Sequence, residues 1–316
     1  MFIGGPAKAG AARGPVNMRG ANASSLNAPC ISVSPTGLRS PGGPSVIPLL
    51  QPLFQGDLAP FGERLQCAAQ PPDGAVPATG LCDPATLGDL LRRYATHVWK
   101  LDAAAQQDLR PLASTWTLRY LAALVPPVAA AASVLEHVFP VALEDVWIRF
   151  DAQGLVVDFH LCALGHSEPG SSTATRYAPL ILGHCAPLFA AMERHARLPA
   201  KVSWSNAARH LEAVLEQTAA LAPQMPGIAR DAAALLQAPE WASQPPRANP
   251  MYREPRVVRI ARQDGGCDDV PLHRECCLYH LLPGDGYCGR CPLDPRHRRP
   301  HPQAAPADAL PASAMP

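Results

Sequence analysis

Val146-Trp147-Ile148-Arg149-Phe150 and Leu155-Val156-Val157-Asp158-Phe159 are two short runs rich in β-branched and aromatic residues. They are joined by Asp151-Ala152-Gln153-Gly154, and a short polar loop ending in glycine between two such runs is typical of a β-hairpin. On both sides of this stretch the apolar residues recur at helical spacing instead. The sequence therefore predicts an α+β fold, with a mostly helical body and at least one β-hairpin.

Helices are predicted upstream and downstream of the hairpin. Asp83 is suited to the N-cap position and Pro84 to the first turn of the first helix. The adjacent prolines Pro126 and Pro127 are expected to separate two helices, because proline lacks the N–H that a helix interior needs. The predicted helices span about residues 84–100, 103–125, 126–139, 179–197 and 203–221.

Composition excludes some classes of function. The 27 basic and 26 acidic residues leave a net charge of +1, which argues against a nucleic-acid binder driven by bulk charge. The most apolar stretch, residues 120–135, is interrupted by the proline pair and is shorter than the ~20 residues that span a bilayer. No transmembrane segment is predicted, and peripheral association with a membrane is left open.

The 37 prolines are concentrated enough at the ends to suggest four regions. Residues 1–45 are basic and lack acidic residues, and they are predicted to be a disordered extension; a transit peptide and a translation start at Met18 are alternatives. Residues 46–250 form the helical α+β body. Residues 251–293 form a cysteine-rich segment, and residues 294–316 form a proline-rich tail predicted to be disordered.

Ten cysteines are present, and the start of the chain has no secretory signal. A disulfide framework is therefore the weaker interpretation, and a cytoplasmic location is expected. Small buried hydrophobic side chains are the expected role of the six scattered cysteines, with Cys162 at a strand end and Cys185 inside a helix. These six are Cys30, Cys67, Cys82, Cys162, Cys185 and Cys267.

The other four cysteines, Cys276, Cys277, Cys288 and Cys291, fall in two close pairs. The turn-forming stretch 283–286 lies between the pairs and can fold one back onto the other, and Gly289 is expected to ease the second turn. Four thiolates suit either a tetrahedral zinc ion or a 2Fe–2S cluster. Adjacent side chains in extended backbone point to opposite faces, which favours two iron ions over one zinc; zinc and a thiol redox switch remain alternatives.

The stretch 275–293, Glu-Cys-Cys-Leu-Tyr-His-Leu-Leu-Pro-Gly-Asp-Gly-Tyr-Cys-Gly-Arg-Cys-Pro-Leu, resembles the C-terminal signature of the FhuF-type ferric siderophore reductases. In that family a Cys-Cys-x10-Cys-x2-Cys motif holds a 2Fe–2S cluster. Residues 202–208, with Trp204 and Asn206, resemble a helix start of the same family, and the resemblance covers about residues 46–293. It implies that Cys276, Cys277, Cys288 and Cys291 are the cluster ligands.

The resemblance also implies an oxidoreductase that transfers one electron to a ferric siderophore, with a hydroxamate type expected, and the helical body, residues 46–250, is expected to bind this siderophore. Ferric iron prefers hard oxygen ligands and ferrous iron is held more weakly, so reduction releases the metal without breaking the chelator. No nucleotide-binding motif is evident, so the electron donor is unidentified. The alternative is a non-catalytic module, siderophore-binding or structural, that zinc stabilises.

Several residues flank the four cysteines. His280 and Tyr287 are expected to pack over the metal or hydrogen-bond near it, and His273 is not needed as a ligand. Arg274 and Arg290 are expected to raise a cluster potential and attract anionic chelates, a solvated role being the alternative. Trp204 and Asn206 are expected to cap a helix and anchor the core.

Overall fold

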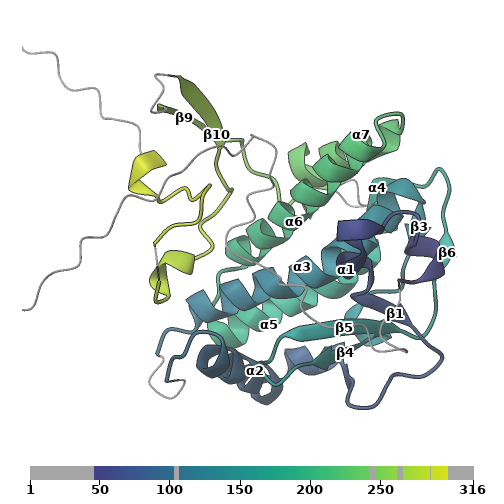
Figure 1. Ribbon diagram of the computed structural model, residues 1–316, viewed down its shortest axis with the longest axis horizontal. Coiled ribbons are helices and arrows are strands. Elements are labelled where there is room, and N and C mark those ends of the chain that lie inside the picture. Colours follow the sequence, from purple (N-terminus) through teal and green to yellow (C-terminus); the bar gives the residue numbers. More distant parts are fainter. Residues whose placement is uncertain (1–45, 103–106, 242–246, 262–265, 285, 298–316) are drawn as a thin grey trace, which may run out of the picture.

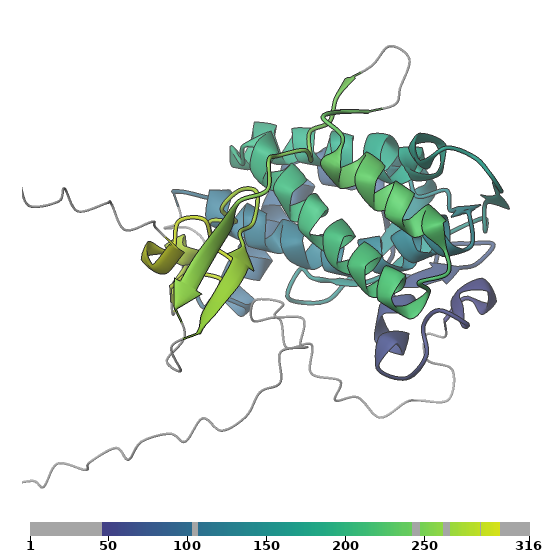
Figure 2. The ribbon, with the colours of Figure 1, turned by 90° about the horizontal axis from the view of Figure 1, so that it is seen from above.

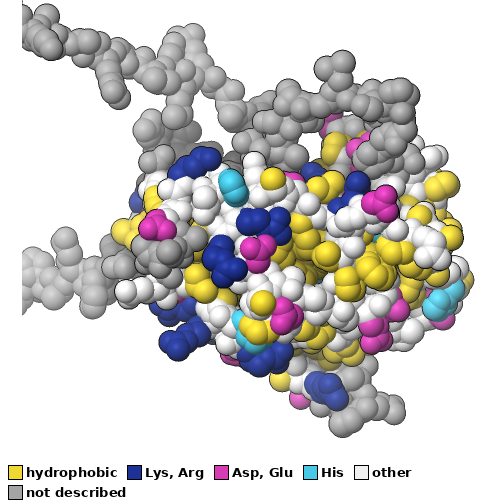
Figure 3. All heavy atoms as spheres, turned by 90° about the horizontal axis from the view of Figure 1, so that it is seen from below, with side chains coloured by type: hydrophobic (Ala, Val, Ile, Leu, Met, Phe, Trp, Pro, Cys, Tyr) yellow, Lys and Arg dark blue, Asp and Glu magenta, His cyan; other side chains and the backbone are white. Residues whose placement is uncertain are grey.

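The computed structural model describes residues 46–102, 107–241, 247–261, 266–284 and 286–297. The predictions for residues 1–45 and for most of the C-terminal tail fall outside these residues. The architecture is α+β, as predicted: helices form one layer and a small mixed sheet forms the other (Figure 1). Basic and acidic side chains are interspersed on the face drawn in Figure 3, in keeping with the net charge of +1.

The predicted hairpin is the centre of the sheet. β4 (Val146–Phe150) and β5 (Val156–Leu161) pair antiparallel, β1 (Leu65–Cys67) runs parallel to β5, and β2 (Val76–Pro77) completes the order β1-β5-β4-β2. Gly154 in the turn has a φ of 78°, and an added Cβ would lie 2.8 Å from the carbonyl oxygen of Leu90. Glycine is therefore required for this turn to pack on the neighbouring helix.

α2 (Pro84–His97) begins as predicted. The Asp83 carboxylate accepts a hydrogen bond from the Thr86 N–H at 2.8 Å, and Pro84 occupies the first turn. This N-cap satisfies one of the backbone donors that a helix start leaves free. Leu87, Leu90, Leu91 and Tyr94 are buried on one side of the helix, and that stripe faces the core.

The proline pair does not end a helix, so this prediction was wrong. A single helix, α3 (Arg110–Val134), passes through Pro126 and Pro127. Nearly every side chain of α3 is buried, and its packing along α6, the sheet and α2 offsets the lost backbone hydrogen bonds. By length and composition α3 could also cross a bilayer, but 83% of its most apolar window is buried inside the molecule, as in a core helix.

The downstream helices are longer than predicted. α4 (Thr173–Ala178) continues through a π-helical stretch, η5 (Pro179–Cys185), into α5 (Ala186–Ala196), where Arg197 adopts a left-handed conformation and stops the run. α6 (Ala200–Leu221) contains the predicted helix at 203–221 and lies along α3. α7 (Pro226–Ala232) and η6 (Ala233–Gln237) then cover α6.

The remaining elements are short. The hairpin of β9 (Val257–Ala261) and β10 (Cys267–Pro271) was not predicted: β9 alternates apolar and polar residues only over Val258–Ile260, and β10 is mostly polar and exposed. The C-terminal segment lies against one end of the helical layer, whereas α4, β3 and β6 lie at the other end (Figures 1 and 2). The other short elements are η1 (Pro48–Leu50), η2 (Gly56–Leu58), α1 (Ala59–Gly62), η3 (Ala78–Cys82), β3 (His137–Val138), η4 (Leu143–Asp145), β6 (His166–Ser167), β7 (Glu240–Trp241), β8 (Arg247–Ala248), η7 (Tyr279–Leu281) and η8 (Pro295–His297).

Candidate metal centre

The four clustered cysteines come together as two pairs. The Sγ atoms of Cys276 and Cys291 are 4.0 Å apart, and those of Cys277 and Cys288 are 3.9 Å apart. Cys277, Cys288 and Cys291 are buried with Leu118 of α3, while Cys276 is half-buried at the edge of the group. Each of the two neighbours in sequence thus approaches a different partner, as expected for adjacent side chains that point to opposite faces.

Backbone N–H groups point at sulfur atoms around Cys276 and Cys291. Leu278 adopts a left-handed conformation with a φ of 62°, and its N–H points at the Cys276 sulfur, 3.3 Å away. In the turn from Cys288 to Cys291, the Cys291 N–H donates to the Cys288 carbonyl at 2.9 Å, and the Leu293 N–H lies 3.4 Å from the Cys291 sulfur. Backbone N–H groups aimed at thiolates stabilise their negative charge and tune a bound metal.

Glycines with a positive φ shape the turn between Cys277 and Cys288, but not the turn between Cys288 and Cys291. Gly284 and Gly286 have φ values of 137° and 92°, so the glycine-dependent conformation lies here. Gly289 has no such positive φ, and the expectation that it eases the second turn was wrong. The Cys288–Cys291 turn is closed by its backbone hydrogen bond, which an ordinary residue at 289 would also permit.

The spacing within each cysteine pair fits metal binding. Two thiolates on one tetrahedral ion with metal–sulfur bonds of about 2.3 Å lie about 3.8 Å apart, close to both separations. Among the described residues, no group of three or more His, Cys, Asp or Glu side chains is arranged to hold a single metal ion. Each pair is thus spaced to bind one metal ion, and the identity of the metal stays a prediction.

The flanking aromatic residues lie where they were expected. His280 Nδ1 is 3.5 Å from the Cys276 sulfur, and the rings of His280 and Tyr287 stack with centroids 5.1 Å apart. Tyr287 is exposed. The Cys276 edge is therefore the side of the group that is closest to solvent.

The tail begins later than residue 293. Asp294 and His297 are both buried, and His297 Nδ1 lies 2.7 Å from the Cys291 carbonyl oxygen. Because a carbonyl only accepts, His297 donates from Nδ1. Residues 294–297 thus pack onto the cysteine segment and do not belong to the tail that was predicted to be disordered.

Polar side chains of α6 contact the cysteine segment, and this contact was not predicted from the sequence. The Ser205 hydroxyl accepts from the Glu275 N–H at 3.0 Å, and Glu212 pairs with Arg274 at 3.2 Å. Arg209 lies between them on the same face, with all three guanidinium nitrogens buried. A polar stripe at positions 205, 209, 212 and 216, next to the apolar stripe at positions 204, 208, 211 and 215, was the available signal.

Electrostatics differ sharply among these groups. The hydrogen bond with Cys288 and the nearby Arg209 guanidinium lower the pKa of Cys277 to about 5, whereas the same bond and burial raise the pKa of Cys288. Burial raises the pKa of Cys276 to about 12. Burial and the neighbouring arginines lower the pKa of His273 to about 2, so this ring is neutral near pH 7.

Other predicted residues are placed elsewhere. Asn206 lies inside α6 rather than at its cap, and its Nδ2 donates to the Ser114 carbonyl of α3 at 3.2 Å. The half-buried Trp204 packs on Phe189. Of the scattered cysteines Cys185 is buried as expected, but Cys67, Cys162 and Cys267 are exposed, so the core role was wrong for these three. Cys30 lies outside the described residues.

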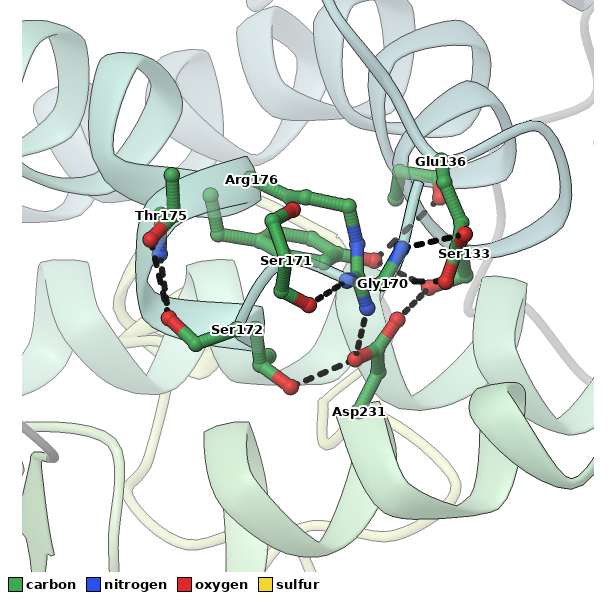
Figure 4. Close-up of polar contacts among 11 residues, drawn as sticks. Ser133, Glu136, Gly170, Ser171, Ser172, Thr175, Arg176 and Asp231 are labelled. Atoms are coloured by element: carbon green, nitrogen blue, oxygen red, sulfur yellow. Dashed lines mark hydrogen bonds and ion pairs between the residues drawn. The ribbon is translucent and has the colours of Figure 1, made fainter. Parts of the chain in front are cut away.

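A cavity of about 460 Å³ lies at the opposite end of the helical layer, between α4 and α7. Figure 4 shows its wall, where Arg176 and Asp231 point toward each other and pair at 2.6 Å. Ser133 of α3 and Thr173 donate to the two oxygens of Asp231. Arg176 Nε and Ser171 Oγ have no hydrogen-bond partner among the described residues.

Comparisons with known proteins agree with the family resemblance. A family described as "Ferric iron reductase FhuF-like transporter" matches residues 114–266. A ferric siderophore reductase of Escherichia coli (strain K12) is 24% identical over 212 residues, which are 66% of this chain and 76% of that protein. Both matches support the FhuF-like ferric siderophore reductases as relatives. The family match ends before Cys276, so the cysteine segment lies outside it.

Two structures of aerobactin synthetase IucA from a hypervirulent pathotype of Klebsiella pneumoniae, one of them bound to ATP, are also similar. Each has a TM-score of 0.43 and 13% sequence identity. The similarity covers 57% of this chain but only 37% or 38% of the synthetase. A likeness at this level carries no argument about the chemistry of this chain.

Proposed function

We propose that this chain is a ferric siderophore reductase in which Cys276, Cys277, Cys288 and Cys291 hold a 2Fe–2S cluster. The observation that carries the proposal is the arrangement of the four thiols as two pairs, 4.0 and 3.9 Å apart. The names of the matched family and of the matched relative support the reductase activity. When bound, such a cluster supplies a one-electron redox couple.

The chain's own residues prepare this centre in three ways. Leu118 and the helical layer cover Cys277, Cys288 and Cys291 and exclude water from them. The N–H groups of Leu278 and Leu293 orient two of the sulfurs. The Cys276 edge, next to His280 and the exposed Tyr287, is the side from which a bulky ferric complex and an electron donor can approach.

The substrate is proposed to be a ferric hydroxamate siderophore. Its hard oxygen ligands bind ferric iron tightly and ferrous iron weakly, so adding one electron releases the metal. No protein acid or base is required for that release. The proposed location is the cytoplasm, where thiols remain reduced. The electron donor is a separate protein or small reductant.

The cavity beside Arg176 is not proposed as the place of reduction. Leu118, which packs on the cysteines, and Ser133, which hydrogen-bonds to Asp231 in the cavity wall, are about 15 residues apart along α3. At 1.5 Å per residue this is roughly 22 Å along the helix axis. A complex in the cavity would therefore not contact the cysteine segment.

The experiment starts with the purified protein. Its visible spectrum, iron content and acid-labile sulfide report the cluster directly. The reduced protein is then mixed anaerobically with a ferric hydroxamate siderophore and a ferrous-specific chelator. We expect reoxidation of the protein, one ferrous ion per electron and recovery of the intact siderophore. A colourless zinc protein, or a reduced protein that persists beside excess ferric siderophore, would rule the proposal out.

A further inference from the structure

Arg209 is a buried cation that lacks a counter-ion among the described residues. It lies one turn after Ser205 on α6, directly beneath the cysteine segment. Its Nε, Nη1 and Nη2 atoms are all buried, and none makes a hydrogen bond of normal geometry with a described residue. The next acidic side chain along α6, Glu212, is engaged by Arg274. An unpaired buried charge is destabilising, so this arginine requires an explanation.

The groups that Arg209 faces are thiols and neutral rings. The guanidinium lies close to the sulfur atoms of Cys277 and Cys288. The rings of His273 and His210 are also near, but an imidazole ring carries no negative charge. The cysteines are therefore the groups that can become anionic next to this guanidinium.

A metal bound to four thiolates supplies the missing negative charge. Four thiolates around one divalent ion, or around an oxidised 2Fe–2S core, carry a net charge of two minus, and one-electron reduction of the cluster makes it three minus. In a buried site such a charge requires compensation, because water cannot screen it. The guanidinium is rigid, permanently charged and suited to this role.

We propose that Arg209 is the buried counter-cation of the four-cysteine centre. Its effect on a reduction potential rests on the proposed function, whereas its compensation of the thiolate charge applies to bound zinc as well. The arginine neutralises part of the negative charge of the loaded site. It stabilises the reduced state more than the oxidised state, because the reduced state is more negative. It therefore raises the reduction potential and the affinity of the site for its metal.

The test compares Arg209→Met with Arg209→Lys and a control, Arg253→Met. Arg253 pairs with Glu275 at 3.6 Å close to the cysteines, but its side chain is exposed and screened by water. In the loaded protein we expect Arg209→Met to lower the equilibrium constant for reduction at least tenfold, which is about 59 mV for a one-electron couple. Arg209→Lys and Arg253→Met should change it less than threefold. An intact cluster with an unchanged potential in Arg209→Met, or an equal loss in Arg209→Lys, would overturn the proposal.

Two further measurements separate this proposal from the proposed function. If the wild-type protein holds zinc without iron or sulfide, the reductase proposal fails, and the counter-cation is tested by zinc competition with a chelator. Arg209→Met should then weaken zinc binding at least tenfold and Arg253→Met should not; equal affinities would overturn the counter-cation. The metal-free Arg209→Met protein should melt no lower than the metal-free wild type, because it loses an unpaired buried charge. A lower melting temperature would assign Arg209 to packing instead and would also overturn it.

Discussion

Cys276 and Cys277 are consecutive residues with different surroundings. Cys277 is buried against Leu118 and approaches Cys288, whereas Cys276 is half-buried and approaches Cys291 and His280. The left-handed backbone at Leu278 follows directly after the pair and turns the chain away. The two neighbouring thiols therefore approach two different partner cysteines.

Replacing Cys288 with serine should remove the proposed cluster. A serine hydroxyl is a harder donor with a much higher pKa than a thiol, so it substitutes poorly for a thiolate. We expect at least a tenfold loss of bound iron and of visible absorption in Cys288→Ser. Cys162→Ser is the matched control, because Cys162 is exposed directly after β5 and is not one of the four clustered cysteines. Equal losses in both variants would show that the ligands are assigned wrongly.

His184 is a buried residue whose protonation state follows from its contacts. Nδ1 lies 2.6 Å from the Val141 carbonyl oxygen, which can only accept, so Nδ1 carries the proton. Nε2 then accepts from the Tyr120 hydroxyl at 2.6 Å. Burial lowers the pKa of His184 to about 4. The folded protein thus holds this ring neutral.

Stability should fall as the pH is lowered from about 6.5 to about 4. In this range the unfolded chain, with a histidine pKa of about 6.5, binds a proton that folded His184 does not bind. His184 accounts for about 3 kcal/mol of this loss, and His210 contributes with the same sign. Denaturant unfolding at pH 7 and pH 4.5 measures the effect. His184→Gln should show a weaker pH dependence, and an identical dependence in both proteins would contradict the assignment.

Three helices meet at the buried carboxylate of Asp231. Asp231 of α7 accepts from Ser133 of α3 at 2.7 Å and pairs with Arg176 of α4 at 2.6 Å, as drawn in Figure 4. Both Asp231 and Arg176 are buried. This network fixes how α7 and α4 sit against the end of α3.

Asp231→Asn should destabilise the fold by about 3–5 kcal/mol, because it removes the carboxylate closest to the buried Arg176 guanidinium and leaves only Glu136, at 3.8 Å. The substitution changes charge with almost no change in volume, so no cavity contributes. Denaturant unfolding measures the difference. Asp89→Asn on α2 is the control: its ion pairs with Arg92 and Arg93 are exposed, and its cost should stay below about 1 kcal/mol. Similar losses in the two variants would mean that the Asp231 network is not a buried ion pair in solution.

The molecule contains two separate apolar clusters. The large one joins the sheet and the helices, and the small one consists of Cys277, Cys288 and Cys291 with Leu118. From residues 251–293 the large cluster buries Met251 and Leu282. The body therefore has a core of its own, whereas the part of the segment around the four thiols contributes few apolar side chains to that core.

Removing the metal from the loaded protein should loosen the cysteine segment and leave the body folded. The free energy of metal binding is the main source of order in a small segment of this kind. Hydrogen exchange should become at least tenfold faster in residues 273–293 after chelation, while α3 and α6 keep their protection. Loss of protection throughout the molecule would show instead that the body and the segment unfold together.

The sequence by itself determined the features whose signals are local. The hairpin at 146–161 follows from residue type and a glycine turn, the start of α2 follows from Asp83 and Pro84, and the cysteine group follows from spacing. Each depends on residues within one turn or one loop. Local reasoning failed where it met Pro126 and Pro127, because packing around α3 outweighs the cost of two missing N–H groups.

Only the tertiary structure decided which distant residues share a site. Ser114 and Asn206 are 92 residues apart, yet their contact brings α3 and α6 together and places Arg209 under the cysteines. The exposure of Cys67 and Cys162 and the cavity beside Arg176 were settled in the same way. Burial and the electrostatic surroundings of a side chain depend on neighbours from other elements, which no local pattern specifies.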